Sequence, residues 1–208
     1  MDRALPGQRT IYELHETNET PLLKQQLERA KLRYKLCFYF PHSKRSMAIR
    51  PIVEYPGPVL LTPGDPVIDF NGDLEALVQD MFDTMYDAEG VGLAAQQIGV
   101  PLRLFVMDCS GIKLVAANPE ILSTEGEQDG DEGCLSVQKV PAPLKRPNKA
   151  LLRAQDVSGE TFEREATGLA ARCFLHETDH CDGRLFIHHL SPLRREMVVR
   201  RFRKLQRR

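Results

Sequence analysis

Apolar residues recur at helical spacing in three segments of the chain. In residues 73–89 they return every three or four positions, which predicts a helix with one buried face. Asn71 or Asp73 can cap the N-terminus of this helix. A second helix is predicted over residues 168–180, and a third over residues 192–208 with its apolar residues on one side.

Four shorter segments carry the aliphatic residues that are typical of strands. Residues 103–108 and 114–118 are predicted as two strands, and residues 150–155 and 161–164 as a hairpin that turns at Ser158-Gly159. Strands combined with a few segregated helices predict an α+β fold. We expect mixed or antiparallel β-sheets around the second helix as the central helix, with the third as a C-terminal helix.

The first 46 residues differ in charge from the rest of the chain. They hold nine Lys/Arg against five Asp/Glu, whereas residues 47–208 hold 19 against 24. We interpret residues 1–46 as a weakly ordered N-terminal extension or the product of an upstream start, with Met47 as the true initiator and residues 47–208 as the main domain. A transit peptide is the alternative, but such peptides are poor in acidic residues.

Length and composition set limits on the class of protein. A chain of 208 residues makes one domain, or one domain with an appendage. Its net charge of -1 disfavours DNA binding through overall charge, and no apolar run approaches the roughly 18 residues of a membrane span. The odd number of cysteines, five, without a secretory signal favours free thiols or metal ligands in a reducing compartment. We therefore expect a cytoplasmic protein that binds neither membranes nor DNA.

The sharpest chemical signal is an H-E-x-x-H pentad, residues 176–180, in the second predicted helix. Residues i and i+4 lie on one helix face, so His176 and His180 can bind one metal ion while Glu177 faces a water molecule. The metal lowers the pKa of that water from about 15.7 toward 7, and the glutamate takes its proton. The competing interpretation is a polar stretch of surface helix.

A catalytic site of this type needs a third protein ligand and an open fourth position. His188 and His189 lie beyond an Asp-Gly turn and are interpreted as surface residues. Two cysteines compete for the place. Cys173 lies one turn before His176 and is displaced from the expected metal position, whereas Cys134 follows a flexible acidic loop. The spacing alone leaves this choice open.

A third segment, residues 90–97, reads G-V-G-L-A-A-Q-Q. Its two glycines are expected to end the first helix and open a loop whose backbone can approach a ligand closely. Gln97 offers an amide N–H that can stabilise an oxyanion. By itself the segment is more typical of a structural helix end.

Together these three segments resemble the peptide deformylases. Residues 90–97 match the motif G-x-G-[aliphatic]-A-A-x-Q of this family, and residues 132–136 match its E-G-C-L-S motif. The third motif, Q-H-E-x-D-H-x-x-G, is matched with Leu175 in place of the glutamine, and Cys181 replaces the usual leucine. The resemblance extends over residues 47–190.

The resemblance implies a metal-dependent hydrolase that removes the formyl group from the N-terminal formyl-methionine of nascent polypeptides. It implies that Cys134, His176 and His180 hold one divalent metal, Fe(II) in most members, in a site that Zn(II), Ni(II) or Co(II) can also occupy. Glu177 would act as general base and then as acid, and Gln97 with the backbone N–H of Leu135 would hold the oxyanion.

The resemblance also implies residues around this centre. Those expected to bind the substrate peptide and its methionine side chain are Val91, Gly92, Gly133, Leu169 and Cys173. Arg146 matches a family arginine that pairs with the aspartate of the pentad. Asp179 and Glu132 are expected to support the metal ligands for a general reason, because a metal-bound histidine usually hydrogen-bonds through its other ring nitrogen. Exposed surface residues are the alternative for the arginine and the aspartate. Leu175 removes no ligand, base or oxyanion donor, so we expect activity to survive this departure.

The third helix carries eight Lys/Arg among residues 194–208. By resemblance this basic surface is expected to contact the ribosome, and a solvated amphipathic face is the alternative. Three other functions were weighed for the whole chain: a zinc peptidase that cuts internal bonds, an inactive family member kept as a binding module, and a structural zinc protein.

Overall fold

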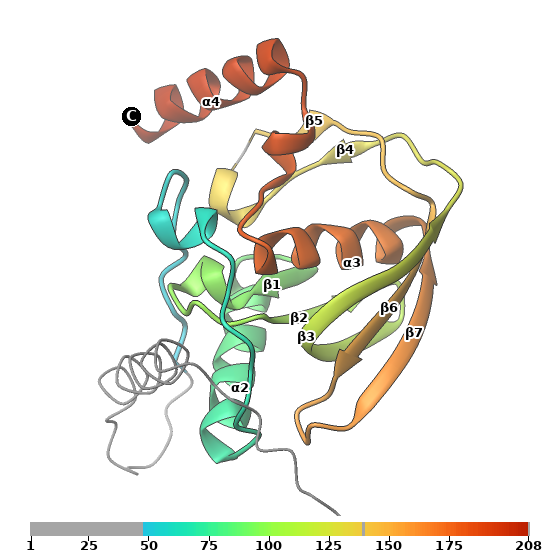
Figure 1. Cartoon of the computed structure of the whole chain (residues 1–208). Coiled ribbons are helices and arrows are strands. Elements are labelled where there is room, and N and C mark those ends of the chain that lie inside the picture. The colour runs from blue at the N-terminus through green and yellow to red at the C-terminus, as the bar shows by residue number, and fades with distance from the viewer. Residues whose placement is uncertain (1–47, 139, 208) are drawn as a thin grey trace, which may run out of the picture. The chain divides into compact units, whose positions relative to one another are not determined.

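The computed structural model describes residues 48–138 and 140–207 (Figure 1). The predicted extension of residues 1–46 and the proposed start at Met47 therefore lie outside the described residues. No helix in the described ranges is long and apolar enough to cross a membrane.

The main sheet has five strands in the order β1-β2-β3-β6-β7, and every neighbouring pair is antiparallel. Its strands are β1 (Gly92–Ala94), β2 (Leu104–Cys109), β3 (Ile112–Glu125), β6 (Lys149–Gln155) and β7 (Thr161–Thr167). A two-stranded antiparallel sheet joins β4 (Asp131–Glu132) to β5 (Ala142–Pro143). The helices are α2 (Gly72–Asp87), α3 (Gly168–Cys181) and α4 (Pro192–Gln206).

The predicted α+β fold is confirmed, with α3 lying against the sheet (Figure 1). The three helices agree with their predicted bounds to within two residues. Asn71 is the cap of α2, because its side-chain oxygen accepts hydrogen bonds from the N–H groups of Asp73 and Leu74 at 3.0 and 3.2 Å. These ends are fixed by local chemistry, which explains why the sequence reveals them.

Two strands differ from the prediction. The segment predicted as a loop after Gly90 contains β1, whose three residues pair with β2 from Gly92↔Met107 to Ala94↔Phe105. Strand β3 is much longer than predicted, because its first part pairs with β2 and its second part with β6. Both differences arise from strand pairing across the sheet, which local apolar spacing does not report.

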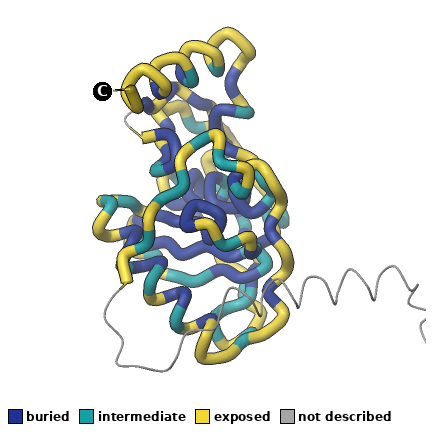
Figure 2. The backbone as a smooth tube through the Cα atoms, turned by 90° about the vertical axis from the view of Figure 1, so that its left-hand side faces the viewer, coloured by how far each residue is buried: buried dark blue, intermediate teal, exposed yellow. Residues whose placement is uncertain are grey.

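Two buried clusters hold these layers together. The first lies between α3 and the sheet, where Phe174 of α3 and Phe105 of β2 are fully buried. The second lies beneath α4, where Val198 and Phe202 join Phe186. The buried segments gather in the interior of the described domain, whereas α4, beside the C mark, is exposed along its outer side (Figure 2). The pentad helix is therefore the buried centre of the domain.

The acidic loop of residues 126–130 is attached to the domain by hydrogen bonds. Gln128 forms a two-way backbone bridge with Arg146, and its side-chain amide donates to the carbonyl of Gly168 at 2.8 Å. Since Gly168 begins α3, these bonds tie the loop to the start of the pentad helix. The loop leads directly into β4 and Cys134, so its attachment helps to position that cysteine.

Candidate metal centre and active site

The two pentad histidines lie on one buried face of α3. Their ring centroids are 5.0 Å apart, and His176 and His180 are 8% and 0% exposed. A polar surface helix would leave both rings in water, so that interpretation is wrong. Burial of two imidazoles without a partner for each is unfavourable, which makes the groups around them informative.

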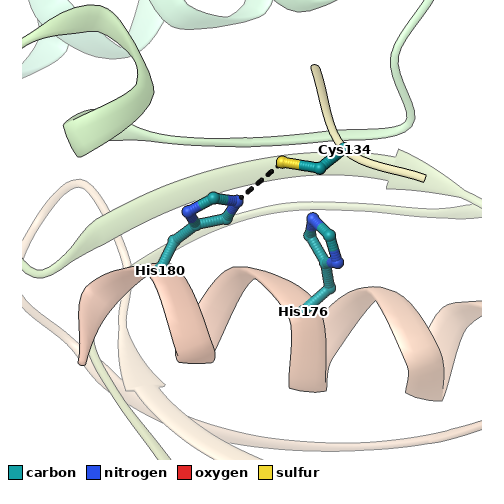
Figure 3. A group of neighbouring side chains, drawn as sticks. All are labelled: Cys134, His176 and His180. Atoms are coloured by element: carbon teal, nitrogen blue, oxygen red, sulfur yellow. Dashed lines mark hydrogen bonds between the residues drawn. The ribbon is translucent and has the colours of Figure 1, made fainter. Parts of the chain in front are cut away.

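Cys134 completes a group of three metal-binding side chains. Its Sγ lies 3.2 Å from His180 Nε2, and it faces the two rings from a separate segment above the helix (Figure 3). The ligand atoms of Cys134, His176 and His180 all lie within 4.8 Å of one another. Cys173 lies elsewhere, with its Sγ 3.8 Å from the carbonyl oxygen of Val91. Of the two competing cysteines, the structure brings Cys134 to the histidines.

The chemistry of this donor set fits a divalent transition metal. Burial raises the pKa of the Cys134 thiol, but the imidazoles of His180 and His176 outweigh burial and lower this pKa to about 5. The thiolate is the form that binds metals. One thiolate and two imidazoles suit Zn(II), Fe(II) or Ni(II), and three protein donors leave a position open for water or substrate.

Glu132 fixes the orientation of the His176 ring. The carboxylate is 3% exposed, and its Oε1 lies 2.8 Å from His176 Nδ1. With Nδ1 donating to this carboxylate, the other ring nitrogen is free to bind an ion. Burial raises the pKa of Glu132, but hydrogen bonds from His176 and Arg146 lower it well below its usual range. The charged form of Glu132 is therefore favoured behind the ring.

Two arginines hold the Glu132 carboxylate from the other side. Arg146 donates through Nε and Nη2 at 3.0 and 2.7 Å, and Arg172 donates through Nη1 at 2.9 Å. Arg146 also lies 2.8 Å from Asp179, whose carboxylate contacts His189 at 2.7 Å. Asp179 thus bonds to Arg146 and His189 rather than to a ring of the pentad histidines.

Arg172 and His189 are the members of this network that the sequence analysis missed. Arg172 lies one turn before His176 on α3, a position that could have drawn attention to it. His189 was interpreted as a surface residue, and its side chain is indeed 34% exposed. The spacing places Arg172 on the helix face but does not reveal its partner Glu132, 40 positions away, and no motif around His189 indicates its contact with Asp179.

Glu177 lies beside the donor group in an unusually enclosed position. It is 4% exposed, and its Oε2 has no hydrogen-bond partner among the described residues. Burial raises the pKa of Glu177 to about 7. A carboxyl group with such a pKa can both accept and release a proton near neutrality.

Gln97 points its amide nitrogen at the same group. Its Oε1 accepts from the N–H of Ala94 at 2.8 Å, and its Nε2 donates toward Cys134 Sγ at 3.6 Å and Ser136 Oγ at 3.4 Å. The residue after Cys134, Leu135, begins a short 3-10 helix (Leu135–Val137). Its backbone N–H therefore belongs to the orphan donors at the start of a helix.

A cavity of about 570 Å³ opens onto Cys134, His176 and Glu177. Val91 and Leu169 line it and are 45% and 54% exposed, whereas Cys173 is 5% exposed. The backbone of Gly92 comes so close to Glu177 that a Cβ on this residue would lie 2.5 Å from Oε1. The five residues expected to bind substrate all line this cavity: Val91, Gly92, Gly133, Leu169 and Cys173.

Comparison with known proteins assigns this arrangement to a family. The model of the polypeptide deformylase family matches residues 49–196. The chain belongs to the peptide deformylase family. The matched region contains all of the described residues named above around the donor group.

Individual deformylases match over nearly their whole length. The peptide deformylase of Acidobacterium capsulatum is 51% identical over 166 residues, which cover 77% of this chain and 98% of that protein. The crystal structure of a peptide deformylase from Legionella pneumophila has a TM-score of 0.74 at 47% identity and covers 77% of this chain and 96% of that chain. The Ehrlichia chaffeensis deformylase in complex with actinonin has a TM-score of 0.72 at 32% identity, covering 78% of this chain and 100% of that one.

Membership gives the activity of the chain. It is a hydrolase that carries out metal-dependent removal of the N-formyl group from nascent peptides. The alternatives of an internal peptidase, an inactive binding module and a structural zinc protein are therefore set aside. The deformylase motifs occupy the elements that form the site: β1 and the 3-10 helix Ala95–Ile98 after it, the end of β4 with the segment that follows it, and α3.

Proposed function

We propose that Cys134, His176 and His180 bind the metal of this deformylase and that Glu177 carries the proton. The observation that carries the proposal is the convergence of three metal-binding atoms within 4.8 Å beside a buried carboxyl group. These polar side chains are buried and border a cavity that a substrate can enter, as a hydrolytic site requires.

The native metal of the proposed site is Fe(II), and Zn(II), Ni(II) or Co(II) can replace it. One thiolate and two imidazoles accept all of these ions, so availability decides which one is bound. A divalent ion held there supplies a Lewis acid for activating water and polarising a carbonyl group.

Glu177 takes a proton from the attacking water in the proposed reaction. The water oxygen forms a bond to the formyl carbon, the carbon–nitrogen bond breaks, and Glu177 passes the proton to the departing amine. The products are formate and a free N-terminal methionine. The raised pKa of Glu177 supports both transfers, because neither protonation state is strongly favoured near pH 7.

Gln97 and Leu135 donate hydrogen bonds to the oxyanion in this proposal. Gln97 is held by its bond to Ala94 N–H, so its amide nitrogen is already directed at the site before substrate arrives. Donors fixed in advance need no reorganisation during the reaction, which is the source of their large effect on rate.

The substrate peptide is proposed to bind in extended form along Val91, Gly92 and Gly133. Strand β1 is an edge strand of the main sheet, so its outer backbone groups can pair with a peptide. The methionine side chain enters the cavity between Leu169 and Cys173.

Formate release from formyl-Met-Ala by anaerobically purified, Fe(II)- or Ni(II)-loaded enzyme tests this assignment. Glu177→Ala should lose turnover by about 10²–10⁴-fold while it keeps its metal, because only the proton carrier is removed. Cys134→Ala should lose both metal and turnover. Actinonin, which is bound to the Ehrlichia deformylase, should compete with the substrate. Full turnover by Glu177→Ala would refute its assigned role.

We further propose that the basic surface of α4 contacts the ribosome. A hollow along this helix is lined by Arg195, Arg200, Arg203, Lys204 and Arg207. Val198 and Phe202 belong to the core, so truncation would damage the fold, and Arg200→Glu with Arg203→Glu is the cleaner change. The double variant should lose salt-sensitive co-sedimentation with ribosomes and keep its deformylase activity. Sedimentation equal to that of the unaltered protein would refute the contact.

A cytoplasmic location is also proposed. Four cysteines in the described ranges are free: Cys109, Cys134, Cys173 and Cys181. Free thiols persist in reducing compartments. Fractionation of cells should recover the protein with cytoplasmic markers.

A further inference from the structure

His189 is connected to His176 by an unbroken series of polar contacts. His189 Nε2 lies 2.7 Å from Asp179 Oδ2, and Arg146 Nη2 lies 2.8 Å from the same oxygen. Arg146 continues to Glu132, whose Oε1 contacts His176 Nδ1 at 2.8 Å. The series therefore runs from a partly exposed residue to one of the three metal-binding side chains.

Burial increases along the series toward the donor group. The side chains of His189, Asp179, Arg146 and Glu132 are 34%, 14%, 7% and 3% exposed. Each charged member is paired with an opposite charge, as buried ions must be. His189 occupies the outer end and is the most exposed member of the series.

The position of His189 restricts how Asp179 and Arg146 can move. Both His189 and Arg146 bind Oδ2 of Asp179, so the carboxylate is held from two directions. The ring nitrogen of His189 also lies 3.4 Å from Arg146 Nη1, which places the imidazole against the guanidinium. Because Nε2 donates its proton to Asp179, this second approach is a contact rather than a hydrogen bond.

Arg146 pairs with two carboxylates, Glu132 and Asp179, so its position depends on both of them. If Asp179 turned toward water, Arg146 would lose one partner and gain freedom to move away from Glu132. Glu132 would then rely on Arg172 and His176 alone. Residues behind a ligating histidine fix its ring and tautomer, and their loss weakens metal binding.

We infer that His189 is a positioning residue that slows loss of the active-site metal by holding Asp179 and Arg146 behind Glu132. The inference rests on the proposed metal site. His189 touches neither the ion nor the substrate in this account. It acts through the hydrogen bond from its Nε2, so a side chain that keeps a donor at this point should preserve the effect.

The test measures how fast Co(II)-loaded full-length enzyme loses its ion to excess EDTA, followed by the visible absorption of bound Co(II). His189→Phe keeps a ring but removes the donor, and should release Co(II) about 10–100-fold faster than the unaltered enzyme. His189→Gln keeps an N–H donor and should stay close to the unaltered rate. His188→Phe is the matched control, because His188 Nδ1 accepts from the N–H of Leu185 at 3.0 Å and lies outside the series.

Three results would overturn the inference. The first is release of Co(II) from His189→Phe at the rate of the unaltered enzyme. The second is release from His189→Gln as fast as from His189→Phe. The third is release from His188→Phe as fast as from His189→Phe. The last two would indicate general loosening of the segment instead of a specific hydrogen bond. An error in the proposed metal site would give a different result, because Cys134→Ala would then release Co(II) no faster than the unaltered chain.

Discussion

The close approach of Gly92 to Glu177 leads to a sharp prediction about Gly92→Ala. A Cβ at this position would lie 2.5 Å from Glu177 Oε1 and 2.8 Å from Cys173 Sγ. The backbone of Gly92 cannot easily move away from Glu177, because β1 is paired with β2 through Gly92↔Met107. Glu177 is buried on α3, so the new methyl group must displace the carboxylate or distort the strand.

The size of the effect follows from these two contacts. Overpacking of this kind lowers the free energy of unfolding by about 1–3 kcal/mol. Displacement of Glu177, the proposed general base, should remove a contribution of about 10²–10⁴-fold to kcat. Gly92→Ala should therefore remain folded and lose most of its turnover.

The assay combines formate release from formyl-Met-Ala with thermal unfolding and metal content. Gly130→Ala is a matched control near the site, because the nearest atom to its Cβ would be Arg172 Nη2 at an ordinary 3.5 Å. It should keep its activity and its metal. A Gly92→Ala enzyme that turns over like the unaltered protein would refute the steric argument, and loss of metal from it would show that the ligands had moved as well.

Three further predictions follow from contacts of single side chains. Glu132→Gln leaves the buried Arg172 without its anion and leaves Arg146 with Asp179 alone, so the free energy of unfolding should fall by about 3–5 kcal/mol in chemical denaturation. An unchanged midpoint would contradict this. Leu175→Gln, which places an amide in a partly buried position beside the first core cluster, should change kcat/KM by less than about tenfold, or 1.4 kcal/mol. The hydrogen bond from the Ser158 side chain lowers the pKa of Asp156. The charged Asp156 therefore stabilises the fold above its unfolded pKa of about 4, and this stabilisation is lost as the pH falls through the lowered folded pKa. Asp156→Ala should thus lower the melting temperature at pH 7, with a difference that shrinks toward pH 3; a constant difference would contradict the assignment.

The parts of the fold that the sequence predicted are those set by neighbouring residues. Helix α2 has a regular apolar spacing and an asparagine cap. Helix α3 begins at Gly168 and is followed by Asp182 as its C-terminal cap, close to its predicted limits. Strand β1 was missed because its glycine resembles a loop, and only its pairing with β2 makes it a strand. The length of β3 was missed for the same reason.

The site shows the same division between local and distant information. The pentad predicted the face that carries His176 and His180, because both lie on one helix. Residue spacing could not choose between Cys134 and Cys173, since Cys134 reaches His180 across 46 positions of sequence. Arg172 looks like a surface arginine until the anion of Glu132, 40 positions away, is placed beside it.

The distribution of the site over three separate segments has a consequence for the order in which the protein is made. Synthesis delivers Gln97 first, then Cys134, and the two histidines of α3 last. The acidic loop of residues 126–130, which precedes Cys134, is bonded to Gly168 at the start of α3, so this attachment forms only after Gly168 has been made. An ion that arrives early meets a single thiol with no histidine beside it. Metal binding at the proposed site therefore requires the histidines of α3 and can only follow synthesis of residues 168–181.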